Sequence, residues 1–220
     1  PLLVKRGFRG EIITTAATRE LTWLTLMDSA HVQEEEARRR ERHGHRIGDR
    51  KPAAPLYSIL DTLDCLRRFG RSAEYEQVIS LIPGLTATFV DAGHILGSAS
   101  ILIEWRDGPE TRSILFSGDI GNAGRPLLRP PSVPARADFV VMESTYGDRR
   151  HRPFDESVAE FTTAIADTFA RGGNVIIPTY ALERAQEILF SLRESVVGGR
   201  LPKSLQVFLD STMAITATEI

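Results

Sequence analysis

The sequence contains a single cysteine, Cys65, among its 220 residues. One thiol excludes a disulfide within the chain and a zinc site built from several cysteines, and it suits a reducing compartment. The chain also lacks an apolar run near the ~20 residues that a membrane-spanning helix needs, and it shows no secretory signal. We therefore expect a cytoplasmic protein without a membrane partner.

A strong excess of basic residues is missing as well. The formal net charge is −2, so no positive field over the whole surface indicates a nucleic-acid partner, and any such contact needs a local patch. With 42% hydrophobic residues, the chain can bury a substantial core, as one large domain or as parts of two. Composition therefore leaves the function open.

Three polar motifs carry most of the functional information. Each one follows an apolar, β-branched run that has the length and composition of a strand; the runs are 85–90, 113–116 and 138–142. The motifs themselves are DAGHILGS at 91–98, FSGDIG at 116–121 and VMESTYGD at 141–148. The sequence thus places His94, Asp119 and Glu143 on loops just past the ends of three successive strands, where sites are commonly built.

In this order the motifs resemble those of metallo-β-lactamase-fold hydrolases of the β-CASP group. That group includes RNase J and the endonuclease subunit of the cleavage and polyadenylation factor, and the likeness is greatest to bacterial enzymes of the second type. Two later stretches also match, GGNVIIPTYALERAQEIL at 172–189 and FLDSTMA at 208–214. The resemblance covers nearly the whole chain, from LLVKRGFRG near its start.

The resemblance implies an α/β fold in two parts. Residues 1–150 correspond to part of a metallo-β-lactamase αββα sandwich, and residues 151–220 to the start of a β-CASP parallel α/β domain. In the family, a His-x-His-x-Asp-His metal motif directly precedes a segment like PLLVKRGF. We therefore expect this chain to be an internal piece of a longer protein, with the remaining metal ligands outside it.

The pattern of the second part agrees with a parallel sheet, because strands and helices alternate. Asp155 is expected to cap a helix that ends at Gly172 and Gly173. The inward positions of this helix are expected to be Val158, Phe161, Ile165 and Phe169. A buried strand at 175–177, a helix at 181–192 and a strand at 206–209 are expected to follow.

The first 50 residues show weaker patterns. They predict a short strand at 8–14, a helix capped by Thr18, and a dense charged segment at 34–42 that is either a solvated helix face or a loop. A non-repetitive loop is expected at 123–136.

Two histidines after the charged segment imitate half of the family's metal motif. His43 and His45 have the His-x-His spacing, but Arg46-Ile47 stands where the motif has Asp-His. We expect neither to bind a metal, and we expect the same of His31 and His151, which lie in polar and arginine-rich surroundings.

By the resemblance, the cofactor is a pair of zinc ions, with His94 binding one ion and Asp119 bridging both and taking part in catalysis. Two such ions, ~3.5–4 Å apart, activate water and compensate the charge that grows on a phosphoryl group. Imidazole nitrogen and carboxylate oxygen are suitable zinc ligands. The alternatives are a capped loop histidine for His94 and a turn aspartate between Gly118 and Gly121 for Asp119.

The resemblance gives Glu143 a catalytic role without metal binding. It would orient a later histidine that assists the leaving group, fixing the tautomer of that imidazole and favouring its protonated form. The alternative is a strand-end glutamate in a salt bridge.

Contacts to substrate are expected from five residues. Arg184 falls in the first turn of a helix, where free N–H groups favour an anion, although it could equally pair with Glu187. Its neighbour Glu183 replaces the glycine often found in relatives and would weaken phosphate attraction. The other four are Tyr146, which could stack a base or pack in its turn, and Ser144, Thr145 and Ser211, for which capping is the favoured alternative.

These expectations together predict a zinc-dependent hydrolase that cleaves RNA phosphodiester bonds by attack of metal-bound hydroxide, in RNA processing. The full-length protein is expected to be the enzyme, with RNA as partner and a possible homodimer, and the 220-residue chain alone is expected to be inactive. One alternative is a DNA-directed β-CASP nuclease, which usually differs around ESTYG. The other is a non-catalytic scaffold subunit, in which the ligands are typically lost.

Overall fold

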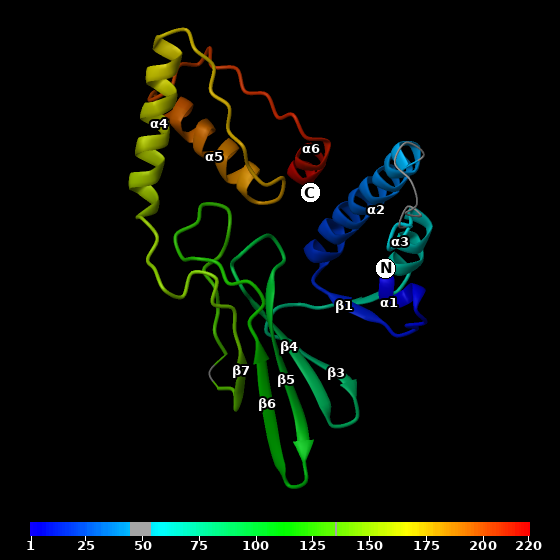
Figure 1. Cartoon of the computed structure of the whole chain (residues 1–220). Helices are drawn as coiled ribbons and strands as arrows, with labels where there is room; N and C mark the ends of the chain where they lie inside the picture. The colour runs from blue at the N-terminus through cyan, green and yellow to red at the C-terminus, as the bar shows by residue number, and fades with distance from the viewer. Residues whose placement is uncertain (45–53, 135) are drawn as a thin grey trace. The chain divides into compact units, whose positions relative to one another are not determined.

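The computed structural model describes residues 1–44, 54–134 and 136–220. His45 and the side chain of His43 lie outside this description. The chain divides into two compact units, which we call unit 1 (Pro1–Ala73, with Ile220) and unit 2 (Glu74–Glu219). Both contain helices and strands, as Figure 1 shows, so the expected α/β class is confirmed. The domain boundary expected at residue 150 stays a prediction.

In its described residues, unit 1 combines three helices with a small parallel pair of strands. The helices are α1 (Leu2–Lys5), α2 (Ala16–Gly44) and α3 (Ile59–Leu66), and the strands are β1 (Ile12–Thr14) and β2 (Phe69–Ser72). Helix α3 begins with a capping box, in which Ser58 and Asp61 satisfy each other's backbone N–H groups. The Lys5 ammonium donates to the Asp61 carboxylate at 2.8 Å and, together with Ser58, lowers the pKa of Asp61 to about 2.

Two expectations for unit 1 are wrong in detail. The strand is restricted to Ile12–Thr14, and the N-terminal cap of α2 is Thr15, because the Thr18 N–H donates to the Thr15 Oγ1 at 3.2 Å. The charged segment is a continuation of α2. Its side chains form ion pairs one turn apart, such as Arg40 with Glu36, so the solvated helix face is confirmed.

Unit 2 is built on a five-stranded sheet with the order β3-β4-β5-β6-β7. Its strands are β3 (Val78–Ile82), β4 (Leu85–Asp91), β5 (Ala99–Asp107), β6 (Glu110–Phe116) and β7 (Phe139–Val141). Strands β3 to β6 are antiparallel neighbours, and β7 runs parallel to β6. The core side chains of β4 include Ala87, Phe89 and Val90, which are almost fully buried.

The three expected strands are present, but they are not successive, because β5 lies between β4 and β6. Strand β5 sets the relative direction of its two neighbours. Since β5 is antiparallel to both neighbours, β4 and β6 run in the same direction, and β7 joins them. The carboxyl ends of β4, β6 and β7 therefore meet at one edge of the sheet.

Three helices complete unit 2: α4 (Phe154–Ala170), α5 (Arg184–Val197) and α6 (Thr212–Glu219). Helices α4 and α5 pack around a small apolar cluster centred on Ile165, Leu192 and Leu201. Phe161 and Ile165 face this cluster as expected, whereas Phe169 is 39% exposed.

The ends of α4 differ in how well they follow the sequence pattern. Its N-cap residue is Pro153, without a side-chain cap, and Asp155 lies inside the first turn. Asp155 therefore complements the helix dipole and does not cap the helix. At the other end the helix stops before Gly172, whose φ is +71°, as expected for a glycine that terminates a helix.

The strands expected at 175–177 and 206–209 are wrong for this structure. Both segments lack regular structure, and most of their apolar side chains are exposed, to 90% at Ile176 and 85% at Phe208. A strand needs a neighbour to receive its backbone hydrogen bonds. Within the described ranges no ladder pairs with either segment, so apolar, β-branched composition alone does not produce a strand here.

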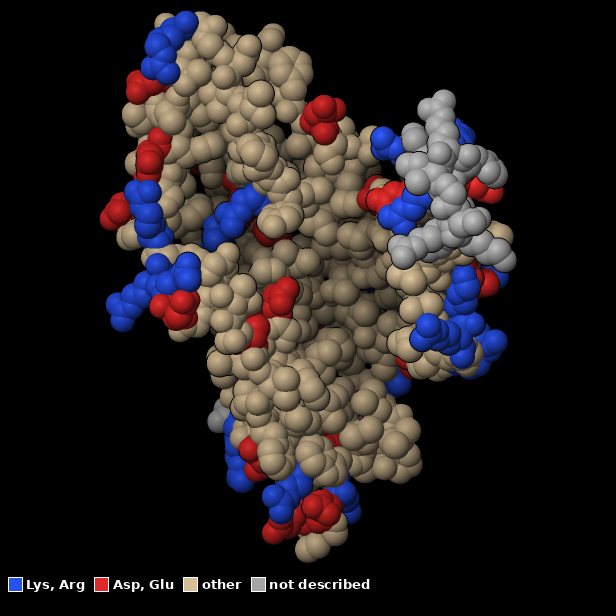
Figure 2. All heavy atoms as spheres, viewed as in Figure 1, with Lys and Arg blue, Asp and Glu red and all other residues tan. Residues whose placement is uncertain are grey.

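The surface agrees with the balanced composition. On the face that Figure 2 shows, basic and acidic side chains of the described residues are interspersed, and they do not form a continuous basic stripe. Among these residues, no helix combines the length and the apolar character that crossing a membrane requires.

Candidate functional site

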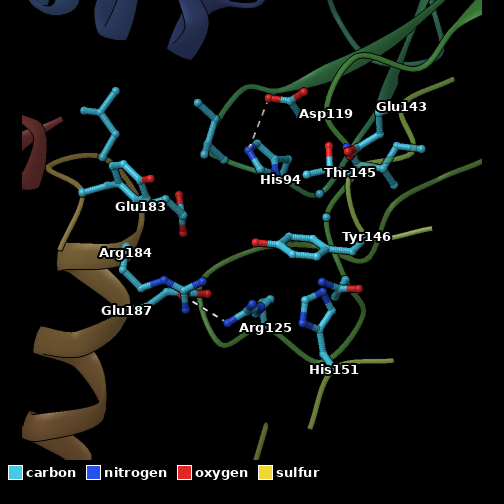
Figure 3. A pocket seen from close by; sticks show the side chains of 17 residues that line it. His94, Asp119, Arg125, Glu143, Thr145, Tyr146, His151, Glu183, Arg184 and Glu187 are labelled. Carbon is cyan, nitrogen blue, oxygen red and sulfur yellow. Dashed lines mark hydrogen bonds and ion pairs between the residues drawn. The ribbon is translucent and has the colours of Figure 1, made fainter. Parts of the chain in front are cut away.

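A pocket of about 630 Å³ lies at the edge of the sheet where β4, β6 and β7 end, within the ~300–1,000 Å³ of typical ligand sites. Figure 3 shows the side chains around it. His94, Asp119 and Glu143 come from the loops after these three strands, and the start of α5 forms another wall. The structure thus brings together three residues that are well separated in the sequence.

The loop that carries His94 is held in shape by its own residues. The Ser98 hydroxyl accepts hydrogen bonds from the backbone N–H groups of His94, at 3.0 Å, and Ile95, at 3.2 Å. This leaves the imidazole available to the pocket, where its Nε2 lies 3.7 Å from the Asp119 Oδ2. Both side chains are accessible, with exposures of 43% for His94 and 74% for Asp119.

The loop that carries Asp119 is pressed against the His94 loop. The Gly121 N–H donates to the Ala92 carbonyl at 2.8 Å. A Cβ on Gly121 would overlap the Gly93 carbonyl, 1.6 Å from its oxygen, so only glycine permits this approach. Close backbone contact therefore fixes the spacing between the two candidate ligands.

The distance between His94 and Asp119 fits a shared cation. Two ligands of one tetrahedral zinc ion, each ~2.0–2.2 Å from the metal, lie ~3.3–3.5 Å apart, close to the observed 3.7 Å. A four-coordinate site needs more donors, and the described part of the chain contains no cluster of three or more His, Cys, Asp or Glu side chains able to hold a metal. The two residues fit part of a metal centre.

Glu143 supports the Asp119 loop from the next strand. Its Oε1 accepts a hydrogen bond of 2.6 Å from the Ile120 N–H, and its own N–H donates to the Ser117 hydroxyl. The Ile120 N–H and then the Thr145 hydroxyl lower the pKa of Glu143, because they stabilise the ionised form. No Lys or Arg of the described residues forms a salt bridge with Glu143. Hydrogen bonds alone therefore account for most of the lowering of its pKa.

The expected substrate contacts divide into those at the pocket and those outside it. Thr145, Tyr146 and Arg184 line the pocket, whereas Ser144 and Ser211 are not among its lining residues. Ser211 caps α6, because the Ala214 N–H donates to its hydroxyl at 3.2 Å. This is the capping role that the sequence favours.

Tyr146 is not packed in its turn. It is 58% exposed, and its ring meets the edge of the His151 imidazole at a centroid distance of 4.7 Å. Figure 3 shows both rings at the pocket. His151 is therefore a pocket residue that sequence reasoning set aside, since its arginine-rich surroundings gave no sign of this location.

Arg184 forms the alternative pairing named above, with Glu187, at 2.8 Å between Nη1 and Oε2. A second guanidinium, from Arg125, lies 3.3 Å from the same oxygen. Arg125 belongs to the loop between β6 and β7 and was not expected at a site. No spacing or periodicity marks it, because only the fold brings this loop to α5.

Glu183 has an unusual backbone conformation at the start of α5. Its φ is +61° and its ψ −56°, and the Arg184 N–H donates to the Leu182 carbonyl at 2.7 Å. This is a γ-turn with a positive φ at its centre, which is rare and strained for any residue with a Cβ. The turn also explains why α5 begins at Arg184 and not at the expected residue 181.

The Glu183 carboxylate is tied to the His94 loop. Its Oε2 accepts a hydrogen bond of 3.2 Å from the Leu96 N–H, and its Oε1 is buried without a partner among the described residues. Burial, and to a lesser extent the charge of Glu187, raises the pKa of Glu183. This residue combines a strained backbone with an incompletely satisfied carboxylate, beside the candidate ligands.

Comparison with known proteins identifies relatives. No protein-family model matches the chain. It is 37% identical over 214 residues to ribonuclease TTHA0252 of Thermus thermophilus, across 97% of the chain and 43% of that protein. It is 28% identical over 214 residues to transcription termination factor FttA of Methanosarcina mazei, across 96% of the chain and 30% of that protein. With endoribonuclease YSH1 of Mycosarcoma maydis it shares 33% identity over 144 residues, across 65% of the chain and 16% of that protein.

These relatives confirm the resemblance seen in the motifs. The chain belongs to the β-CASP group of the metallo-β-lactamase family. It spans less than half the length of the relatives named above.

Two substitutions at Glu183 separate backbone strain from the lost carboxylate. Glu183→Ala and Glu183→Gly both remove the side-chain contacts, but only glycine accepts the positive φ at low cost. We expect the glycine variant to have the higher free energy of unfolding, by ~1–2 kcal/mol, in denaturant titrations. At an unstrained position glycine is the less stable of the two by ~0.4–1 kcal/mol, so equal or greater stability of the alanine variant would contradict the strained turn.

Proposed function

We propose that the protein containing this chain is a zinc-dependent ribonuclease that cleaves RNA phosphodiester bonds during RNA processing. The observation that carries the proposal is the convergence of His94 and Asp119 at one edge of the sheet, 3.7 Å apart, in a family whose relatives are named ribonuclease and endoribonuclease. We also propose that residues 1–150 are part of an αββα sandwich and residues 151–220 the start of a β-CASP domain. A cytoplasmic location is proposed from the single cysteine, and a homodimer stays a prediction.

His94 and Asp119 would hold the zinc ions, with Asp119 between the two. When bound, such ions supply an activated water and neutralise charge on the phosphoryl oxygens. The accessible positions of both side chains suit this role, because a metal and a phosphate must both reach them. The further ligands are expected outside this chain, as the family's motifs imply.

Glu143 would control a proton. Its lowered pKa keeps it ionised at neutral pH, so it can accept an N–H from an imidazole, fix the tautomer of that ring and favour its protonated form. The proton on the opposite ring nitrogen would then pass to the oxygen of the leaving group. The carboxylate already accepts from the Ile120 N–H and from Thr145, and its two oxygens carry about four acceptor sites in all, so it can accept the imidazole N–H as well.

Substrate contacts are proposed for the residues expected from the sequence. Tyr146 has the exposure that stacking on a base requires, and Arg184 and Thr145 also line the pocket. Ser144 and Ser211 would have to contact RNA beyond this pocket. A DNA-directed nuclease and a non-catalytic scaffold are the alternatives, and retention of both His94 and Asp119 disfavours the scaffold.

Substitution of Asp119 tests the metal centre. In the complete protein, Asp119→Ala should lose bound zinc and nuclease activity together, because a bridging carboxylate contributes to both ions. Zinc content by metal analysis, RNA cleavage and circular dichroism measure metal, activity and fold. Asp167→Ala, which removes an exposed aspartate from α4, should change none of them. Two zinc ions per chain in the Asp119 variant would refute the bridging role.

Substitution of Glu143 tests a role in proton transfer. Glu143→Gln keeps an oxygen that can accept from the Ile120 N–H, so the Asp119 loop and both metal ions should be retained. Cleavage should slow by ~10²–10⁴-fold, the usual size of a general acid–base contribution. If this variant loses zinc, Glu143 is a ligand or a folding residue, and the proposed role is wrong.

The 220-residue chain alone should not be a competent nuclease. Two donors hold zinc weakly, and few bound ions would remain to lower the pKa of water. RNA cleavage by this chain, assayed with and without added zinc, should stay at background. Robust turnover that needs zinc and disappears in His94→Ala would show that the site is more complete than we propose.

A further inference from the structure

Two arginines and one buried glutamate form a compact group on the pocket wall formed by α5. Glu187 is only 5% exposed. Its Oε2 accepts hydrogen bonds from the guanidinium groups of Arg184, at 2.8 Å, and Arg125, at 3.3 Å. In Figure 3 the three side chains lie together, on the other side of the pocket from His94 and Asp119. We call this group the arginine pair with its Glu187 anchor.

The charges of this group do not cancel. Two guanidinium groups against one carboxylate leave a formal charge of +1, and a buried carboxylate needs at least one such partner. Each guanidinium carries five N–H donors, and the contacts to Glu187 come from one nitrogen, Nη1, of each. The remaining donors can therefore bind a second anion.

The exposure of the two arginines shows where that anion can approach. The Arg184 side chain is 49% exposed and that of Arg125 is 23% exposed, and both line the pocket. Here the anion is buried and the cations face the pocket.

The arginine pair is also pre-organised. Arg125 lies over the Phe154 ring, 5.5 Å from its centroid, which restricts the plane of the guanidinium. The Arg184 guanidinium is held by its hydrogen bond to Glu187, at 2.8 Å. A site whose donors are already oriented loses less entropy when it binds a ligand, so a modest net charge can still give useful affinity.

We propose that Arg125 and Arg184, held as a pair by Glu187, bind a phosphodiester group of the RNA next to the one that is cleaved. The inference rests on the proposed function, which places the cleaved group at His94 and Asp119. Planar guanidinium groups match the geometry of phosphate oxygens. Glu187 is then a positioning residue, and Arg125 is a binding residue that the sequence does not reveal.

Glu183 opposes this binding and so provides a second way to probe it. Its carboxylate interacts electrostatically with Arg125, Glu187 and His94, and its negative charge repels a phosphate in the same pocket. The variant Glu183→Gln keeps an oxygen acceptor for the Leu96 N–H and removes the charge. If the arginine pair binds phosphate, this variant should bind RNA at least as tightly as the unaltered protein.

The test measures steady-state cleavage of a short single-stranded RNA by the complete, zinc-loaded protein. Arg125→Ala and Arg184→Ala should each raise KM about tenfold and change kcat by less than about twofold, because a neighbouring phosphate that does not itself react is bound equally in the ground and transition states. Each should also lower the salt dependence of log kcat/KM by about 0.7, the contribution of one phosphate contact on a single strand. Zinc content should not change.

Matched variants separate binding from structure. Arg193→Ala removes an exposed arginine from the same helix and should leave KM unchanged. Arg125→Lys and Arg184→Lys keep the charge but lose the planar fork, so KM should rise less than in the alanine variants, with the original salt dependence. If the alanine variants unfold, the lysine variants decide the question by KM.

Two results would overturn the inference. One is an unchanged KM and salt dependence in the folded arginine variants; the other is weaker RNA binding by Glu183→Gln. Failure of the proposed function is a different result, namely no zinc-dependent cleavage by the unaltered protein. In that case equilibrium binding of the same RNA, which needs no cleavage, decides on the arginine pair, and absence of any RNA binding would refute it too.

Discussion

The contact between Gly121 and the Gly93 backbone is the constraint on which the candidate site depends. Strand direction brings the ends of β4 and β6 to the same edge of the sheet, but β5 separates them by a full strand. The two loops must therefore bend toward each other, and the hydrogen bond from Gly121 to Ala92 holds them there. Without a glycine at 121 the backbones could not approach, and the 3.7 Å between His94 and Asp119 would not be possible.

Opposed charges organise the α5 side of the pocket in a different way. Glu187 is buried and paired with two arginines, whereas Glu183 is half-buried, and one of its oxygens has no hydrogen-bond partner among the described residues. The paired carboxylate of Glu187 is a stable anchor. At Glu183 two unfavourable features coincide: a carboxylate with an unsatisfied oxygen and a strained backbone turn. The pocket therefore combines two arginines that are held in place by Glu187 with a carboxylate, that of Glu183, which is held by its hydrogen bond from the Leu96 N–H.

The residues of the candidate site can be predicted from the sequence more reliably than the helices and strands around them. His94, Asp119 and Glu143 can be found because each motif follows its strand directly, and strand ends are local features. Arg125 cannot be found in this way, since its place depends on how a proline-rich loop folds back on α5. The strands expected at 175–177 and 206–209 fail for a related reason: their composition is right, but a strand is defined by hydrogen bonds to a neighbour. Glu183 stands where the resemblance leads us to expect glycine, and its φ of +61° explains why glycine suits that position.

The hairpin between β5 and β6 has a practical consequence. Because β5 starts at the pocket and runs away from it, the turn at 107–110 lies at the opposite edge of the sheet. Gly108 in this turn has a φ of +62° and open space around it, and the turn is exposed. Exposed loop tips of this kind accept inserted segments with little effect on the core. A tag or fluorophore placed there would be carried by the same sheet that carries the candidate ligands, so it could follow the motion of that sheet without touching the pocket.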